Sequence, residues 1–341
     1  MDVRQLGELE LIRRVRDASG RAPAPGVRTG IGDDAAVLDL TPGAALLATT
    51  DLLIEDVHFR RASASPRDIG WKAMAVNLSD IAAMGGNPRW ALVALALPAS
   101  AETAEVDEFY GGLYEAAGPH GVVLVGGDTS ASPDGWMITV TLLGEHPGTP
   151  RLRSMASPGD AVAVTGTLGR SAAGLAALEM GREHAGRKGI GARVLDEITG
   201  AHLRPTARIA EGRWLAQQPA VHALIDCSDG LATDLGHICR ESGVGARVTL
   251  DQVPVAPATR EAAKALGRDP IEWAAAGGED YELILTCEPD AAAPLADGLL
   301  RSTGTPLTVI GRIEAGSARV VWVDARGETV PISAGYEHFH G

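Results

Sequence analysis

Residues 65–97, SPRDIGWKAMAVNLSDIAAMGGNPRWALVALAL, predict a helix that leads directly into a strand. Ser65 is a favourable N-cap, Pro66 suits the first helical position, and Asp68 completes a pattern similar to a capping box. The Gly-Gly-Asn-Pro that follows ends the helix. The apolar run over residues 90–97 is typical of a buried strand. The stretch therefore predicts an α/β or α+β fold.

One acid lies on the apolar face of this predicted helix. Apolar positions and Asp80 recur there in steps of three and four, which points the Asp80 side chain inward. A buried carboxylate without a partner is costly, so we expect Asp80 to meet a metal ion, a cation or several hydrogen-bond donors. A hydrogen bond between the helix and a loop is the alternative, and this position taken by itself does not separate the two.

Further strands are predicted on both sides of this stretch. They are residues 45–49, 122–125 and 137–143 in the first half, and 161–164, 221–225, 281–286, 308–310 and 318–323 in the second. Between the halves, the segment HPGTPRLRSMASPG at 146–159 is rich in proline and glycine and predicts a domain boundary. A chain of 341 residues favours two domains, here residues 1–148 and 149–341.

The composition excludes several classes of protein. A net charge of −14 and an aromatic content of 4% are the opposite of what nucleic-acid binding requires. The first ten residues mix acids with apolar residues, unlike a secretory signal, and the longest apolar run, 90–99, is shorter than the roughly 20 residues that span a membrane. The three cysteines form no CxxC pair. We therefore expect buried thiols in a reduced, cytoplasmic protein.

Acids follow several of the predicted strands. They are Asp51, Asp128, Asp226 and Asp229, and a glycine-containing turn adds Asp33 and Asp34. A single aspartate in a turn is more often a turn-former or a helix cap than a ligand. As a set, however, acids at strand ends are expected to converge, and massed carboxylates repel unless hard cations lie between them. The set therefore favours Mg²⁺, Ca²⁺ or Mn²⁺ over zinc.

Motifs of other enzyme classes are missing from the sequence. There is no GxxxxGK[ST] loop, no GxSxG elbow and no set of protein-kinase motifs. The run GTLGRSAAG at 166–174 does not have GxGxxG spacing and predicts a tight strand-to-helix turn. With few basic residues to clamp phosphates, several Mg²⁺ ions would have to neutralise a polyphosphate.

Several short motifs occur in order along nearly the whole chain. They are GDDAAV at 32–37, ATTD at 48–51, VHF at 57–59, WKA at 71–73, NLSDIAAMGG at 77–86, GGDT at 126–129, TGTLG at 165–169, DCSDGL at 226–231, GGEDYEL at 277–283 and GYEHF at 335–339. Together they resemble the thiamine-monophosphate kinase family, within the aminoimidazole-ribonucleotide synthetase superfamily. The resemblance implies that ATP phosphorylates thiamine monophosphate in the final step that makes thiamine diphosphate.

The resemblance also implies a fold and a set of site residues. The implied fold has two α/β domains, in which the N-terminal sheet forms a homodimer interface and the C-terminal domain contains a mixed sheet. Residues 1–148 would bind metal and ATP, and residues 149–341 would add metal, ATP and substrate contacts. The implied Mg²⁺ ligands are Asp33, Thr49, Thr50, Asp51, Asp80, Asp128, Asp226 and Asp229, and the catalytic residues among them are Asp51, Asp80 and Asp226. The implied ATP contacts are Tyr110, Gly127, Asp128, Arg153 and Ser228, and the implied thiamine monophosphate contacts are His58, Glu279 and Tyr336.

Ordinary structural roles are the alternative for five of these contacts. Tyr110 could pack within a helix, Arg153 could be a solvated linker residue, and His58 could be a hydrogen-bonded histidine of a strand. Glu279 could be a turn residue, and Tyr336 could pack near the end of the sequence. Without the resemblance, the ordinary role is the favoured interpretation at each of the five positions.

Two alternative functions also remain. One is another ATP-using enzyme of the superfamily. A selenophosphate synthetase would need a reactive cysteine or an equivalent residue near the N-terminus, but no cysteine precedes Cys227. A hydrogenase-maturation protein would need a C-terminal cysteine, but this sequence ends in Phe339-His-Gly341. The other is a non-catalytic module that binds divalent cations.

Overall fold

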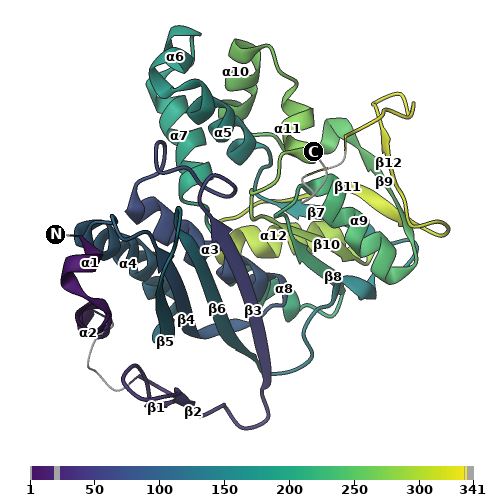
Figure 1. Cartoon of the computed structure of the whole chain (residues 1–341). Helices are drawn as coiled ribbons and strands as arrows, with labels where there is room; N and C mark the ends of the chain where they lie inside the picture. The colour runs from purple at the N-terminus through teal and green to yellow at the C-terminus, as the bar shows by residue number, and fades with distance from the viewer. Residues whose placement is uncertain (1, 19–23, 334, 336–341) are drawn as a thin grey trace. The chain divides into compact units, whose positions relative to one another are not determined.

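The computed structural model describes residues 2–18, 24–333 and 335 (Figure 1). The chain divides into two compact units, one of Met1–Ile81 with Gly86–Thr149 and the other of Ala82–Gly85 with Pro150–Gly341. Each unit is built around its own β-sheet, and each sheet combines parallel and antiparallel pairs. Within the described residues, no helix is both long and apolar enough to cross a membrane.

The first unit contains a four-stranded sheet in the order β3-β6-β4-β5. The strands are β3 (Ala45–Ile54), β4 (Asn87–Leu97), β5 (Val123–Ala131) and β6 (Met137–His146), and β4–β5 is the parallel pair. Helices α3 (Pro66–Ala83) and α4 (Thr103–Ala117) cover one face of the sheet (Figure 1). The two helices pack closely at Gly70, where a Cβ would lie 1.9 Å from the carbonyl oxygen of Phe109.

The other face of this sheet is open. Leu46 and Leu52 on β3 are 48% and 50% exposed, and Met137 on β6 is 39% exposed. Leu47 and Leu53, one position on in each case, are buried against the helices, as alternation along a strand requires. The remaining elements of this unit are α1 (Val3–Leu6), α2 (Glu8–Ala18), β1 (Val27–Thr29), β2 (Val37–Leu38) and η1 (Gly118–His120).

The second unit contains a six-stranded sheet in the order β12-β9-β11-β7-β10-β8. Its strands are β7 (Ala161–Thr165), β8 (Val221–Asp226), β9 (Gly245–Thr249), β10 (Leu283–Cys287), β11 (Leu307–Glu314) and β12 (Val320–Val323). Its helices are η2 (Arg153–Met155), α5 (Arg170–Met180), α6 (Arg182–Arg187), α7 (Ala192–Leu203), α8 (Ile209–Ala216), α9 (Leu231–Ser242), η3 (Leu250–Gln252), α10 (Pro257–Leu266), α11 (Pro270–Ala276), η4 (Pro289–Ala291) and α12 (Ala292–Thr303).

Two hydrophobic clusters stabilise this unit. One joins the sheet to α9 and α11, with Leu235 and Ile238 of α9 fully buried. The other joins α5, α6, α7 and α10 into a helical layer around Ala177 and Ile198. The cysteines Cys227, Cys239 and Cys287 are free and buried, as the sequence predicts.

The predicted helix–strand unit is confirmed. The helix begins at Pro66, and the Ser65 hydroxyl accepts from the Asp68 N–H while Asp68 accepts from the Ser65 N–H, both at 3.2 Å. Every predicted strand is present, but β9 and the short β1 and β2 were not predicted. The expectation that acids stand at strand ends is wrong for Asp51 and Asp128, because β3 and β5 continue three residues beyond each of them.

Candidate active site

In the first unit, β3 and α3 bring three of the predicted ligands together. Thr49 and Asp51 are two residues apart on β3 and therefore share the face that α3 covers. The Thr49 hydroxyl donates a hydrogen bond to Oδ2 of Asp80 on α3. All three side chains are half-buried. The side chain of Asp80, which was predicted to point inward, thus has the hydroxyl of Thr49 and the carboxylate of Asp51 as neighbours.

The Asp51 carboxyl is in an unfavourable place for a negative charge. Burial, and then the charge of Asp80, raise the pKa of Asp51 to about 7. Two carboxylates and a hydroxyl form an oxygen donor set of the kind that hard divalent cations prefer. These residues therefore fit a Mg²⁺ ion, whose charge would offset the repulsion between the two acids.

Thr50 lies on the opposite face of β3. Its hydroxyl lies 3.2 Å from the carbonyl oxygen of Val140, to which it donates, and 3.1 Å from the hydroxyl of Thr141 on the neighbouring strand. The structure does not bring the Thr50 side chain together with Thr49 and Asp51. Its role as a ligand stays a prediction.

Strand register separates Asp128 from Asp51. Asp51 aligns through Val140 and Val93 with Gly127, whereas Asp128 aligns with the exposed Ala94 in the next row. β3 and β5 are the two edge strands of the four-stranded sheet, so their backbones lie three strand spacings, or about 14 Å, apart. Asp128 therefore belongs to the open face of the sheet, and Asp51 to the face covered by helices.

Gly127 has a steric reason to be glycine. It has φ of 157°, and a Cβ there would lie 2.0 Å from the carbonyl oxygen of Val93. The Gly-Gly-Asp run thus lets β5 approach β4 closely at the point where Asp128 reaches the open face.

The other predicted contacts of this unit occupy different surroundings. His58 closes the turn after β3, where its Nδ1 accepts from the Ile54 N–H at 3.1 Å. Asp33 is exposed, and its Oδ1 accepts from the N–H of Asp34 at 2.9 Å. Tyr110 is 6% exposed and packs edge-on against Phe109, with ring centroids 5.2 Å apart. Burial raises the pKa of Tyr110, and its contact with ATP stays a prediction.

In the second unit, the end of β8 and the loop that follows it carry the predicted ligands Asp226 and Asp229. Asp226 ends β8 and is 5% exposed, so here the acid does stand at a strand end, as predicted. The following loop is held by the segment before β10: the Glu279 N–H donates to Ser228 O at 2.7 Å, and the Tyr281 N–H donates to Cys227 O at 2.9 Å. The structure therefore brings Asp226, Ser228, Asp229 and Glu279 onto two adjoining loops.

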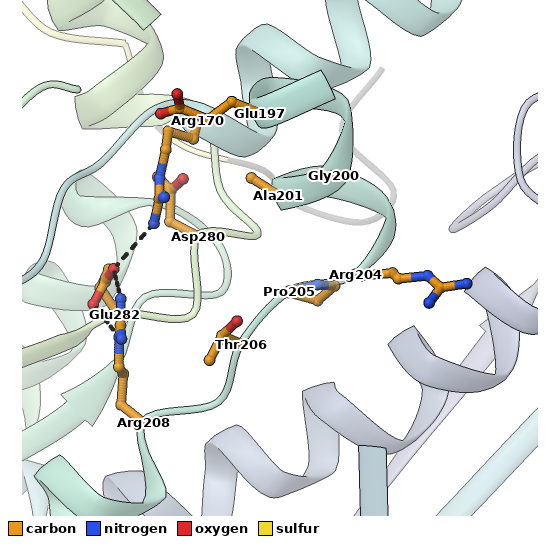
Figure 2. Close-up of a pocket in the computed structure, with 10 residues that line it drawn as sticks. All are labelled: Arg170, Glu197, Gly200, Ala201, Arg204, Pro205, Thr206, Arg208, Asp280 and Glu282. Carbon is orange, nitrogen blue, oxygen red and sulfur yellow. Dashed lines mark hydrogen bonds and ion pairs between the residues drawn. The ribbon is translucent and has the colours of Figure 1, made fainter. Parts of the chain in front are cut away.

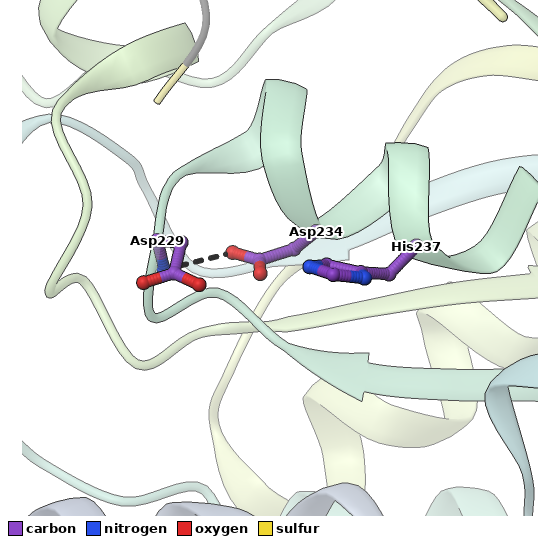
Figure 3. Close-up of side chains that lie close together, drawn as sticks. All are labelled: Asp229, Asp234 and His237. Atoms are coloured by element: carbon purple, nitrogen blue, oxygen red, sulfur yellow. Dashed lines mark hydrogen bonds between the residues drawn. The ribbon is translucent and has the colours of Figure 1, made fainter. Parts of the chain in front are cut away.

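Asp234 and His237 are two residues of this region that sequence reasoning missed (Figure 3). Single ligand atoms of Asp229, Asp234 and His237 lie within 4.8 Å of one another. Asp234 is 2% exposed, and burial with the charges of Asp226 and Asp229 raises its pKa well above the usual value. It accepts from the Asp229 N–H at 3.1 Å. Its buried position on the first turn of α9 is the same signal that singled out Asp80.

Arg153 and Gly335 also approach this loop. Arg153 is exposed on η2, and its carbonyl oxygen accepts from the hydroxyl of Ser242 at the end of α9. Its charge contributes to lowering the pKa of His237, after burial and Arg240. The Gly335 N–H donates to the Thr233 hydroxyl at 3.1 Å. Tyr336 lies outside the described residues.

A polar pocket of about 180 Å³ lies between α5, α7 and the segment before β10 (Figure 2). Arg208 forms two hydrogen bonds of 2.7 and 2.6 Å to the buried Glu282, which also accepts from the Thr165 hydroxyl. Asp280 accepts from the N–H groups of Gly169 and Ser171 at the start of α5. Burial raises the pKa of Asp280 to about 7, and the two N–H donors oppose the rise.

Comparison with known proteins decides the family. Two family models match the chain: AIR synthase related protein, N-terminal domain, over residues 32–146, and AIR synthase related protein, C-terminal domain, over residues 157–324. The thiamine-monophosphate kinase of Escherichia coli (strain K12) is 38% identical over 335 residues, 98% of each protein. The chain belongs to the thiamine-monophosphate kinase family.

Solved structures of the thiamine-monophosphate kinase family share the fold. The crystal structure of the enzyme from Stenotrophomonas maltophilia K279a matches with a TM-score of 0.80 and 37% identity, over 94% of this chain and 96% of that one. The structure of AaThiL complexed with AMPPCP and TMP matches with a TM-score of 0.76 and 34% identity, over 99% of both chains. The predicted two-domain fold of the AIR synthase type, with mixed sheets in both parts, is thereby confirmed.

Proposed function

We propose that this thiamine-monophosphate kinase transfers the γ-phosphoryl group of ATP directly and in line to the phosphate of thiamine monophosphate. The products are thiamine diphosphate and ADP. The observation that carries the proposal is the full-length likeness to thiamine-monophosphate kinases, 38% identical over 98% of both chains. It is supported by AaThiL, at 34% identity, whose structure was solved in complex with the ATP analogue AMPPCP and with TMP.

Two groups of residues would hold Mg²⁺. Asp51, Asp80 and Thr49 form the first, where burial and then the charge of Asp80 raise the pKa of Asp51. Asp226 and Asp229 form the second, and Asp33, Thr50 and Asp128 stay predicted ligands. Bound Mg²⁺ supplies charge neutralisation between the two phosphates and stabilises charge on the transferring group.

The chain's own residues orient the two substrates. The acceptor oxygen of thiamine monophosphate is already anionic near neutral pH, so no side chain has to remove a proton from it. The barrier lies in holding two polyanions in line, which is a task of positioning. We infer that Tyr110, Gly127, Asp128, Arg153 and Ser228 contact ATP, and that His58, Glu279 and Tyr336 contact thiamine monophosphate.

The predicted division of labour follows from the same residues. Residues 1–148 would bind metal and ATP, and residues 149–341 would add the second group of ligands and the acceptor contacts. The free cysteines of the described residues suit a reducing, cytoplasmic setting.

We further propose a homodimer formed through the open face of the first unit's sheet. The face exposes Leu46, Leu52 and Met137, an apolar surface of the kind that marks interaction sites. Asp128 lies in the row of this same face, so pairing two copies there would bring Asp128 to the interface.

One assay tests the activity. The protein is mixed with ATP, MgCl₂ and thiamine monophosphate, and the products are separated by chromatography. We expect thiamine diphosphate and ADP in equal amounts, and none when EDTA is added. Thiamine, a purine-pathway intermediate and selenide serve as control acceptors for the alternative enzymes of the superfamily. Binding of Mg²⁺ without release of ADP would instead support the non-catalytic module.

A further inference from the structure

The segment that carries His58 leaves β3 as a tight, strained turn. The N–H groups of Val57 and His58 both donate to Ile54 O, at 3.1 and 2.9 Å. The Asp56 N–H donates to Phe59 O at 2.8 Å. Asp56 has φ of 65°, in the left-handed region that a residue with a side chain rarely adopts. A backbone in this conformation persists only where its surroundings hold it in place.

One end of the turn is fastened to a buried tryptophan. The Glu55 N–H donates to Trp136 O at 3.0 Å, and Oε2 of Glu55 accepts from the main-chain N–H of Trp136 at 2.9 Å. Trp136 is 0% exposed, and its ring packs edge-on against Phe109, with centroids 6.0 Å apart. Glu55 therefore ties the start of the turn to the core of the first unit.

Arg61 fastens the other end of the turn to the same tryptophan. Its guanidinium carbon lies 5.2 Å from the centroid of the Trp136 ring, and its Nη2 pairs with Oε1 of Glu105 in the first turn of α4. The side chains of Arg61 and Glu105 are 32% and 27% exposed, so solvent screens the pair only in part. Glu105 is itself oriented, because its Oε2 accepts from the Glu102 N–H at 2.9 Å. Arg61 thus joins an aromatic face to a fixed carboxylate.

These two attachments lie on either side of His58. Glu55 precedes His58 by three positions and Arg61 follows it by three, and both contact Trp136. The position of the His58 backbone therefore depends on contacts that are made by its neighbours in sequence.

We propose that Arg61, paired with Glu105 and stacked on Trp136, is a positioning residue that keeps His58 where thiamine monophosphate binds. The inference rests on the proposed function, and within it on the proposed contact between His58 and thiamine monophosphate. Arg61 acts through the turn and does not touch the acceptor. Its loss should therefore weaken binding of the acceptor and leave ATP binding and the chemical step unchanged.

Steady-state kinetics of Arg61→Met provide the first test. The substitution keeps an unbranched apolar side chain and removes the charge that faces Trp136 and Glu105. We expect the KM for thiamine monophosphate to rise roughly threefold to thirtyfold, with kcat and the KM for ATP unchanged. Arg61→Lys, which keeps the cation, should recover most of this loss. Equal changes in both KM values, or no recovery in the Lys variant, would overturn the proposal.

Arg67→Met is the matched control. Arg67 on α3 pairs with Glu115 of α4, as Arg61 pairs with Glu105 of the same helix, but Arg67 lies outside the turn. Both substitutions remove one arginine that pairs with an acid of α4. The control should leave the KM for thiamine monophosphate within about twofold of the wild-type value. An equal rise in the control would show a general effect of the lost charge and would refute a specific role for Arg61.

Hydrogen exchange of the turn provides a readout that does not depend on catalysis. In the substrate-free protein, the amides of Val57 and His58 report the hydrogen bonds to Ile54 O. They should exchange roughly tenfold faster in Arg61→Met and at the wild-type rate in Arg67→Met. Unchanged exchange in Arg61→Met would show that the turn does not need this arginine, and the proposal would fail.

A double-mutant cycle with His58→Ala separates positioning from a general loss of structure. If Arg61 acts through His58, adding Arg61→Met to His58→Ala should not raise the KM for thiamine monophosphate further. Additive losses would count against the proposal. Should Arg61→Met fail to fold, Glu105→Gln takes its place, because it removes the paired charge and keeps an acceptor for the Glu102 N–H.

The same experiments distinguish failure of this inference from failure of the proposed function. A wild type that does not phosphorylate thiamine monophosphate would remove both together. An active wild type with an additive cycle, or with an unchanged KM for thiamine monophosphate in His58→Ala, would remove the inference alone.

Discussion

Asp51 on β3 and Asp80 on α3 form a pair of half-buried carboxylates on the helix-covered side of the first sheet, and the charge of Asp80 acts on Asp51. Thr49, two residues before Asp51, donates its hydroxyl to Asp80. A pair of like charges in this position is unfavourable for the metal-free fold and favourable for a bound cation. Stability and activity should therefore respond in opposite directions when the pair is broken.

Replacing Asp51 with Ala tests that opposition. We expect turnover to fall by roughly a thousandfold or more, because an electrostatic group at the reacting phosphates is lost. The chain should stay folded, and the metal-free variant should be more stable than wild type at pH 8 by on the order of 1 kcal/mol. Thermal unfolding in EDTA and the coupled assay measure the two effects. Normal turnover at saturating Mg²⁺ would contradict the assignment of Asp51.

The pH dependence of metal-free stability follows from the same residue. The folded pKa of Asp51 is about 7, above the value of 3.8 that is usual for an aspartate. The unfolded chain therefore releases this proton first, and stability is lost as pH rises from about 4 to about 7. Above that range the contribution is constant. Denaturant titrations in EDTA measure the free energy of unfolding at each pH. Its decrease with rising pH should be smaller in Asp51→Asn and unchanged in Asp290→Asn, which alters an exposed aspartate.

Magnesium affinity should rise over an overlapping range of pH. Below pH 7 the ion must displace a proton from Asp51, so the apparent Kd should fall by up to about tenfold per pH unit until pH 7 and then level off. Calorimetric titration with MgCl₂ at pH 6, 7 and 8 measures it. An affinity that does not change with pH would show that Asp51 is not a ligand.

The fold was largely predictable from local patterns. Caps, glycines and apolar runs identified α3, β4 and most other strands, because these signals are local in sequence. β9 was missed, since the five residues GARVT contain one large apolar residue, Val248, and so carry little apolar signal. β10 starts two residues later than predicted, at Leu283, because Tyr281 has φ of 51° and cannot join a ladder.

The site was predictable only in part, for physical reasons. Motif order identified Asp51 and Asp80, but an apolar run that stops at an acid looks like a strand end even where the backbone ladder continues. The placing of Asp128 on the open face depends on register across four strands, which no local pattern encodes. His202 contacts Glu279 over a separation of 77 positions, so only the folded chain reveals the pair.

Removing the hydroxyl of Thr49 should weaken metal binding without unfolding the chain. Thr49→Val loses the hydrogen bond to Asp80, and we expect the Mg²⁺ affinity to fall roughly tenfold, because the ligand loses its orienting partner. Thr139→Val is the matched control, because Thr139 lies on β6 in the row of the open face, paired with Leu52. Calorimetric titration of both variants with MgCl₂ measures the two affinities. Equal losses in the two would refute a specific role for Thr49.

The buried pair of Arg208 and Glu282 should dominate the stability of the second unit. Arg208→Met leaves a carboxylate with 0% exposure without its main partner, and we expect a loss of roughly 3 to 5 kcal/mol in the free energy of unfolding. Adding Glu282→Leu should restore much of it. Arg326→Met breaks an exposed pair with Asp324 and should change the free energy of unfolding far less. Comparable losses in both single variants would contradict this.

The open face of the first sheet gives the most direct test of the proposed homodimer. Leu52→Asp places a charge on that face, and a symmetric dimer would bury two copies of it, so we expect the dimer to dissociate. Leu300→Asp is a matched control, because Leu300 on α12 is equally exposed, at 52% against 50% for Leu52. Sedimentation velocity should find a monomer only for Leu52→Asp. If Asp128 works at the interface, that monomer should also lose turnover while its melting curve stays cooperative. A monomeric wild type, or an active Leu52→Asp monomer, would leave the open face without this role.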